Sequence, residues 1–394
     1  MIVQPKVKGF MCTTAHSEGC RAAVKQQIDY IKSMPKAEGP KKVLVIGSSM
    51  GYGLASRIAA TYVCGADTIG IIFDKPGKEK RTGSAGWYNT AAFEEFASAD
   101  GHYAKTINGD AYSQEIKEQT IEMIRQDWGK VDMVIYSIAA PRRKAPDGVT
   151  YRSVLKTVGE SYHNQTVNLM TNQIEDAVIE PANEQEIHDT IKVMGGEDWK
   201  LWMRALQEAD VLSEGARTVA YSYIGPELTY PIYYNGSIGQ AKQDLYRTAD
   251  EIQAEIPGIE AYVSVNKAVV TQSSAAIPIV PLYISILFRV MKEKGLHEGC
   301  IEQMYRLIHD RLCAQEVPVD EQRLIRVDDY EMKPEVQQAV EEIWSQINND
   351  NLTELADLDG FWDGFYEIFG FRIDGVDYDQ EVDIQIPIPS LSES

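Results

Sequence analysis

The segment from Lys41 to Arg57, KKVLVIGSSMGYGLASR, decides the fold class. Its first half, KKVLVIG, is a short apolar run stopped by a glycine, which is typical of a buried strand. Three glycines, Gly47, Gly51 and Gly53, then lead into a segment with helical character. Glycines there permit a tight turn and a close approach of backbone to ligand, and the following helix presents its N-terminus to a pyrophosphate. The segment predicts a strand–turn–helix unit that binds a dinucleotide; a turn without a ligand is the alternative.

Strand-like and helix-like segments alternate on both sides of this unit. That rhythm predicts an α/β protein, an expanded Rossmann-type domain with a doubly wound parallel sheet, like that of short-chain dehydrogenases. We expect a single domain over residues 1–394, with an N-terminal extension (1–40), an insertion near the active site (141–216) and a C-terminal elaboration (317–394). The expected strands are 41–47, 68–74, one ending at Asp110, 131–140, 217–225 and 260–266, and the expected helices are 22–33, one after Gly53, 113–129, 197–208, 238–254 and 334–347.

The composition excludes several classes of protein. A formal charge of −21 argues against a nucleic-acid partner, which needs cationic side chains, and against an anionic membrane surface. The five cysteines are odd in number and irregularly spaced, so a reducing compartment, the cytoplasm, fits best. Cys12, His16 and Cys20 have no fourth ligand nearby, so we expect no metal. The N-terminus has no apolar signal-peptide core, and the apolar run 275–288 is too short to span a bilayer; we interpret it as a buried or pocket-lining helix.

The ends of the expected strands carry candidate cofactor residues. Phe73 and Asp74 end the second strand, where an acid suits the adenosine ribose diol and repels a 2′-phosphate. This favours NADH over NADPH; Lys75 argues the other way, and a solvated aspartate is the alternative. Small residues end the next two strands, at Asp110–Ala111 and Ile138–Ala139, where a cofactor can lie close to the sheet edge.

A tyrosine-rich stretch, YSYIGPELTYPIYYNGSIGQAK (221–242), precedes and enters the helix after the fifth strand. Short-chain reductases pair a tyrosine, which donates to a developing oxyanion, with a lysine that binds the nicotinamide ribose. Lys242 is the lysine of that helix. Four residues before it stands Ile238 and seven before it Asn235, so the spacings of carbonyl reductases and of common enoyl reductases are absent. The remaining pattern is Tyr233-x8-Lys242, with Tyr234 as the competing phenol.

That spacing, together with the words AYSYIGP, GSIGQAK, SVNKAVVT, KVMGGEDW and HEGCIEQ, resembles the trans-2-enoyl-CoA reductase family, whose bacterial members include the V-type enoyl-[acyl-carrier-protein] reductases. The resemblance runs from MIV at the start to GFRIDGVDY near the end. It implies that Tyr233 is the proton donor, with Lys242 as its catalytic partner, and that Tyr223 touches the substrate carbonyl, while Tyr221, Tyr230 and Tyr234 are wall or packing residues. Family members often carry glutamate where this chain has Asp74. The residues that the resemblance assigns to NADH are Gly47, Ser48, Ser49, Met50, Gly51, Tyr52, Phe73, Asp74, Asp110, Ala111, Ile138, Ala139, Lys242, Val269, Val270 and Thr271.

The resemblance implies an enzyme of fatty acid synthesis that reduces the trans-2 double bond of an enoyl-CoA or enoyl-[acyl-carrier-protein] thioester with NADH, as a monomer. Two alternatives differ in activity: a carbonyl reductase on the same fold, and a non-catalytic NAD-sensing protein. For the phosphates of the carrier we expect a basic docking site at Arg142-Arg143-Lys144, with Lys75, Lys78, Lys80 and Arg81 as the next cluster; a solvated basic loop at 142–144 is the alternative.

Overall fold

The fold is described from a computed structural model, which covers residues 1–8, 11–272 and 274–392. Its centre is a seven-stranded sheet in the order β13-β12-β11-β6-β3-β4-β5, in which every neighbouring pair is parallel. The strand order reverses between β3 and β6, the place where doubly wound sheets bind ligands at the carboxyl ends of the strands. The predicted fold class is confirmed. The strands are β3 (Lys42–Ile46), β4 (Asp67–Ile72), β5 (Ala104–Asn108), β6 (Val131–Tyr136), β11 (Leu212–Ser222), β12 (Glu260–Val265) and β13 (Leu324–Arg326).

Helices cover both faces of the sheet because successive side chains of each strand point to opposite sides. Val43 and Val45 of β3 face one apolar cluster, whereas Leu44 and Ile46 face another. The first face is covered by α1 (Ser17–Ser33), α2 (Gly51–Cys64), α3 (Ala85–Ala99), α9 (Cys300–Arg306) and the π-helical turn η3 (Leu307–Leu312). The second is covered by α4 (Gln114–Asp127), α6 (Glu197–Glu208) and α7 (Ser237–Glu255).

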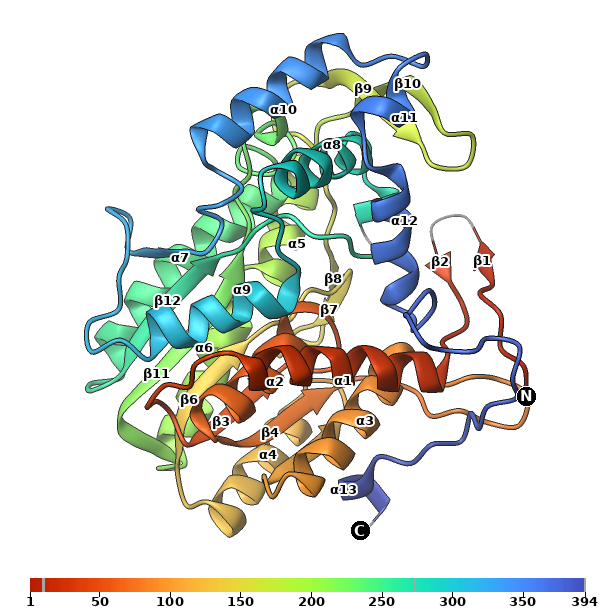
Figure 1. The fold of residues 1–394 in the computed structure, drawn as a ribbon. Coiled ribbons are helices and arrows are strands. Elements are labelled where there is room, and N and C mark those ends of the chain that lie inside the picture. Colours follow the sequence, from red (N-terminus) through yellow and green to blue (C-terminus); the bar gives the residue numbers. More distant parts are fainter. Residues whose placement is uncertain (9–10, 273, 393–394) are drawn as a thin grey trace.

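A third apolar cluster surrounds α8 (Val280–Glu293), which lies beyond the sheet with α10 and the hairpin of β9 and β10 packed on it (Figure 1). The apolar run predicted as a buried helix is mostly this helix. The insertion and the C-terminal segment supply most of its neighbours: β9 (Tyr162–Asn168), β10 (Gln173–Ile179), α10 (Pro334–Gln346), α11 (Leu352–Leu355) and α12 (Leu358–Glu367). The remaining elements are β1 (Val7–Lys8), β2 (Met11–Cys12), β7 (Arg142–Lys144), β8 (Thr150–Arg152), α5 (Glu184–Met194), η1 (Glu227–Thr229), η2 (Ser274–Ala276) and α13 (Pro389–Ser392).

The structure differs from the sequence-based prediction at several ends. Helix α1 begins at Ser17 rather than at residue 22, because the His16 ring accepts a hydrogen bond from the Gly19 N–H and caps the helix. Strand β4 ends at Ile72, so that Phe73 and Asp74 lie in the loop after it. Helices α3 and α9 and the edge strand β13 were not predicted. Among the residues described, none of the helices combines the length and the hydropathy needed to cross a bilayer.

Candidate active site

The glycine turn after β3 depends on close backbone contacts. Gly47 has a φ of +87°, and a Cβ on it would lie 2.5 Å from the Ser137 carbonyl oxygen. A Cβ on Gly53 would lie 1.8 Å from the Gly47 carbonyl oxygen. Helix α2 then begins at Gly51, and no side chain caps its first turn. The N-terminus of α2 can therefore receive a ligand phosphate.

A cavity of about 520 Å³ opens at this turn, along the carboxyl ends of the central strands. Thirteen of the sixteen residues predicted to bind NADH line it: Gly47, Ser49, Met50, Gly51, Tyr52, Phe73, Asp110, Ala111, Ile138, Ala139, Lys242, Val270 and Thr271. Gly51 and Tyr52 lie at the start of α2 and Lys242 lies on α7; the other ten come from the loops after β3, β4, β5, β6 and β12, and the fold brings all of them to one edge. The sequence did not single out Tyr112, Tyr136, Ser137 and Gln272, which also line the cavity; their positions at strand ends were the available signal.

Three predicted cofactor residues do not line this cavity. Ser48 is buried and its hydroxyl donates to the Ile71 carbonyl (3.3 Å). Val269 lines a neighbouring cavity of about 580 Å³. Asp74 lines a third cavity, of about 630 Å³, which shares Met50 and Gln272 with the first.

The Asp74 carboxylate is held by the start of α3. The Ser84 hydroxyl donates to it (2.7 Å), and it lies over Gly86, where a Cβ would come within 2.5 Å of its oxygens. Burial raises the pKa of Asp74, although the hydrogen bond from Ser84 opposes this shift. Of the two residues that follow β4, the exposed Phe73 and not Asp74 lines the first cavity.

Lys242 lies on α7 and its Nζ donates to the Tyr221 carbonyl (2.8 Å). Burial lowers the pKa of Lys242 from 10.5 to about 8. The glycines of GSIGQAK explain how α7 reaches this place. A Cβ on Gly239 would lie 2.0 Å from the Tyr234 carbonyl oxygen and 2.3 Å from that of Tyr233. The first turn of α7 is thus packed directly against the tyrosine turn.

The neighbouring phenols Tyr233 and Tyr234 lie in different surroundings. Tyr233 packs with the α8 cluster and meets the Tyr223 ring edge-to-face, with centroids 4.8 Å apart. Tyr234 packs against the cluster on the second face of the sheet and lies 5.0 Å from the Tyr230 ring. Within the described part of the chain, the Tyr233 hydroxyl makes no hydrogen bond. Burial raises the pKa of both Tyr233 and Tyr223, so both phenols keep their protons at neutral pH.

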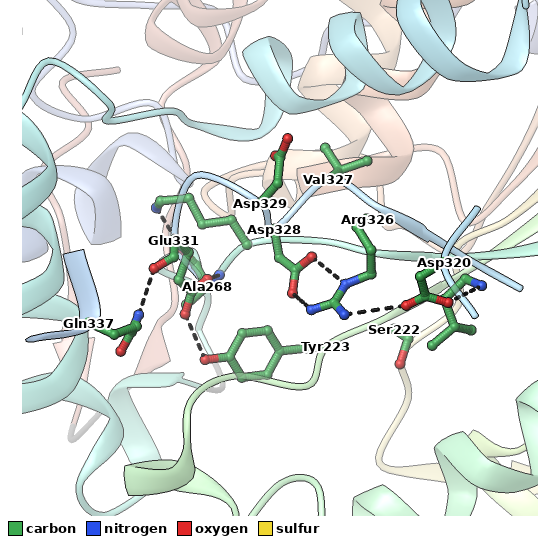
Figure 2. A network of polar contacts seen from close by, with 12 residues as sticks. Ser222, Tyr223, Ala268, Asp320, Arg326, Val327, Asp328, Asp329, Glu331 and Gln337 are labelled. Carbon is green, nitrogen blue, oxygen red and sulfur yellow. Dashed lines mark hydrogen bonds and ion pairs between the residues drawn. The ribbon is translucent and has the colours of Figure 1, made fainter. Parts of the chain in front are cut away.

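Tyr223 is held by a buried carboxylate that the sequence did not reveal. Its hydroxyl donates to Glu331 Oε1 (3.1 Å), and Tyr283 of α8 donates to the same oxygen (2.6 Å). The second oxygen, Oε2, accepts from the Ala268 N–H (2.7 Å). Figure 2 shows Tyr223, Glu331, Ala268 and Gln337 converging from separate parts of the chain. Glu331 stands in the C-terminal segment, 108 residues after Tyr223, so no local motif links them.

The expected basic docking site at Arg142-Arg143-Lys144 is wrong. Strand β7 pairs with β8 and alternates, so Arg142 and Lys144 point outward whereas Arg143 is 1% exposed. Arg143 forms an ion pair with Glu197 (2.6 Å) and donates to the Lys192 carbonyl. The second cluster, Lys75, Lys78, Lys80 and Arg81, is exposed, and in the described structure none of its four cations has an ion-pair partner. Three of them, Lys75, Lys78 and Arg81, line the cavity at Asp74.

Three family models match successive parts of the chain. Residues 81–313 match the trans-2-enoyl-CoA reductase catalytic region, and residues 2–79 match the NAD(P)H binding domain of trans-2-enoyl-CoA reductase. Residues 319–382 match a model described as an enoyl reductase FAD binding domain. In this segment, which is described throughout, the only strand is the edge strand β13, and no glycine stands between it and α10. The segment as described thus has no phosphate turn of the kind found at Gly47.

Curated relatives and solved structures match the chain over nearly its full length. It is 54% identical to a trans-2-enoyl-CoA reductase [NADH] of Ruminiclostridium cellulolyticum, covering 99% of this chain and 100% of the relative. It is also 54% identical to an enoyl-[acyl-carrier-protein] reductase [NADH] of Coxiella burnetii, covering 100% of this chain and 98% of the relative. The crystal structure of Clostridium acetobutylicum trans-2-enoyl-CoA reductase in complex with NADH superposes with a TM-score of 0.94 at 42% identity, covering 98% of each chain. That of the Treponema denticola enzyme with NAD gives 0.93 at 46% identity, covering 97% of this chain and 98% of the other.

Proposed function

The chain belongs to the trans-2-enoyl-CoA reductase family, and from this premise we propose that it reduces the trans-2 double bond of enoyl thioesters with NADH in fatty acid synthesis. One observation in this chain supports the proposed activity most directly. The turn that holds Tyr233, whose hydroxyl has no hydrogen-bond partner among the described residues, leads directly into α7. Helix α7 places Lys242 in the wall of the 520 Å³ cavity at the Gly47 turn, here called the dinucleotide cavity.

The residues at the cavity fit NADH. In this proposal the turn from Gly47 to Tyr52 and the start of α2 hold the pyrophosphate, and Asp110 and Ala111 border the adenine. Lys242 binds the nicotinamide ribose. When bound, NADH supplies the hydride that the β-carbon of the substrate receives.

The two partly buried tyrosines, Tyr223 and Tyr233, act on the thioester. As the β-carbon is reduced, negative charge builds on the thioester oxygen, and a proton finally reaches the α-carbon. Tyr233 donates to that oxygen and Tyr223 orients the carbonyl; a preorganised hydrogen bond to a developing charge is strong where a bound substrate excludes water. The Lys242 ammonium adds positive potential below its pKa of about 8.

The test is consumption of NADH in the presence of crotonyl-CoA, with identification of butyryl-CoA as the product. A ketone or an alcohol with the oxidised cofactor serves as the comparison substrate. Turnover of the ketone alone would indicate a carbonyl reductase, and binding of NADH without any turnover would indicate a sensor.

We further propose that the carrier, CoA or acyl carrier protein, docks its phosphates at the cavity lined by Lys75, Lys78 and Arg81. Their lack of ion-pair partners supports this in a chain whose net charge is −21. Such a chain repels an anionic carrier unless a local basic site overrides its field. This cavity is a neighbour of the dinucleotide cavity, since Met50 and Gln272 line both.

Charge reversal tests the docking site. Arg81→Glu should raise KM for crotonyl-CoA, and more so at low salt, because exposed charges are screened over roughly 10 Å at 0.1 M. The rate with crotonyl-pantetheine, which lacks the phosphates, should stay unchanged. Lys144→Glu, at an exposed cation of β7, is the matched control. An equal response of KM to both substitutions contradicts the docking site.

The role of Asp74, the number of domains, the location and the oligomeric state are also proposals. We propose that Asp74 favours NADH by occupying the space at the start of α3 that a 2′-phosphate would approach. Comparing kcat/KM for NADH and NADPH in Asp74→Ser tests this, and an unchanged ratio contradicts it.

We also propose a single-domain, cytoplasmic monomer. The five cysteines, all described, are free thiols, which suits a reducing compartment; light scattering at working concentration tests the monomer.

A further inference from the structure

The hydrogen-bond network around Glu331 raises a question about Tyr223. Glu331 is 0% exposed, and both phenols that reach it, Tyr223 and Tyr283, end on the same oxygen, Oε1. The Gln337 side-chain amide donates to the Glu331 backbone carbonyl (2.7 Å) and to the Tyr283 hydroxyl (3.3 Å). The mechanism above needs Tyr223 to donate toward the substrate, yet in this arrangement it donates to Glu331.

A phenol carries one proton, so these two demands compete. If Glu331 is ionised, its oxygens can only accept hydrogen bonds, and the Tyr223 O–H must donate to Oε1. The Tyr223 oxygen then presents only lone pairs to the substrate, which repel a developing oxyanion. If Glu331 is protonated, its own O–H can donate to the Tyr223 oxygen, and the Tyr223 proton is free to point into the active site.

We propose that Glu331 is a positioning residue that switches Tyr223 between these two directions and makes it a donor to the substrate carbonyl when Glu331 carries a proton. This inference rests on the proposed function, because it assigns a new role within the same reaction. No bond to the substrate involves Glu331, which acts only through Tyr223.

The groups around Glu331 act on its pKa in opposite directions, and the net result is a rise. Burial raises the pKa of Glu331, and nearby Asp328 raises it further. The buried ammonium of Lys267, the Tyr283 hydroxyl and the Ala268 N–H oppose this rise. Tyr223, Tyr233 and Tyr52 are the other titratable groups that Glu331 influences, and burial raises the pKa of all three, so they stay protonated while Glu331 titrates.

Glu331→Gln separates the two states of Glu331. The Ala268 N–H needs an acceptor at the Oε2 position, so the amide oxygen of the glutamine takes that place. The amide NH2 then faces Tyr223 and Tyr283 and donates to them at every pH. The variant therefore imitates protonated Glu331 and cannot lose that proton.

The experiment is the pH profile of kcat/KM with crotonyl-CoA. In the wild type, kcat/KM should fall as pH rises through the pKa of Glu331, in addition to the separate fall near pH 8 expected from Lys242. In Glu331→Gln the first fall should be absent. At the pH where kcat/KM of the wild type has fallen about tenfold through this titration, kcat/KM of the variant should stay within about twofold of its value at acid pH. In a Tyr223→Phe background, Glu331→Gln should change kcat/KM less than about twofold, because Glu331 has no hydroxyl left to direct.

A second variant keeps the test open if Glu331→Gln does not fold. Tyr283→Phe removes one hydrogen bond that stabilises the ionised carboxylate, so the first fall should move to higher pH. Glu298→Gln is the control, because Glu298 is equally a buried glutamate but pairs with Arg306 (2.6 Å) and contacts neither tyrosine; it should keep the wild-type first fall. A wild-type profile in Glu331→Gln, or a full effect of that change in Tyr223→Phe, overturns the proposal while leaving the reductase function intact. A wild type that does not consume NADH with crotonyl-CoA overturns both.

Discussion

Tyr233 and Tyr234 are adjacent in the sequence, yet their side chains point to different surroundings, and only that of Tyr233 lies beside Tyr223. Both are tyrosines on the same turn, yet Tyr233 faces the α8 cluster beside Tyr223, and Tyr234 faces the second face of the sheet beside Tyr230. The spacing to Lys242 favoured Tyr233, and the packing gives an independent reason for the same choice.

Tyr233→Phe removes the hydrogen bond to the developing oxyanion. We expect kcat to fall about a hundred- to a thousandfold, roughly 3 to 4 kcal/mol of transition-state stabilisation. NADH affinity should hardly change, because the phenol does not line the dinucleotide cavity. Tyr234→Phe is the matched control and should keep nearly full activity. A dead Tyr234→Phe with a normal Tyr233→Phe would assign the role to the other phenol.

Lys242 should give the reaction an alkaline limit. Its pKa is lowered to about 8 by burial, so the charged form, which binds the ribose and stabilises the oxyanion, is lost as pH rises through that value. We expect kcat/KM to fall with a midpoint near pH 8. Lys242→Arg keeps its charge throughout this range, so its remaining activity should lack that fall. The same fall in both proteins would contradict the assignment.

At the scale of elements, the two glycine turns position the chemistry. Gly53 lets α2 approach the carbonyl of Gly47, and Gly239 lets α7 approach the carbonyls of Tyr233 and Tyr234. In both places the required contact is between backbones, so no side chain can adapt to relieve it.

Gly53→Ala and Gly51→Ala make a matched pair. The methyl group added by Gly53→Ala would meet a backbone oxygen at 1.8 Å, whereas at Gly51 nothing lies within 4 Å and only the φ of +53° disfavours alanine, by about 1 to 2 kcal/mol. Gly53→Ala should therefore abolish NADH binding, measured by fluorescence titration, and Gly51→Ala should weaken it much less. Equal affinities in the two variants would contradict a phosphate turn of this geometry.

Gly239→Ala tests the second turn. The added methyl group must displace the tyrosine turn or α7, so kcat should fall together with thermal stability. Gln240→Ala, at an exposed position of the same helix, should change neither. Full activity in Gly239→Ala would show that the backbone of this turn does not set the position of Tyr233.

Over the whole molecule, local patterns predicted the central strands and the helices between them, because apolar periodicity and glycine turns are properties of short segments. The glycine turn and the strand ends predicted part of the cavity at Gly47, since parallel strands bring their carboxyl ends to one edge, whereas Val270 and Thr271 were predicted from the family resemblance. Ser48 and Val269 missed that cavity because their side-chain directions depend on tertiary packing. Glu331 and the burial of Arg143 could not be predicted, since each depends on a partner from a distant segment, α8 for Glu331 and α6 for Arg143.

The central claim is that this fold carries hydride from NADH to the β-carbon of an enoyl thioester. The most direct measurement uses NADH deuterated at the transferable position, crotonyl-CoA and mass spectrometric analysis of the product. We predict butyryl-CoA with a single deuterium at C3, and a solvent-derived proton at C2. Deuterium at C2, deuterium on a carbonyl carbon, or unchanged crotonyl-CoA would contradict the account.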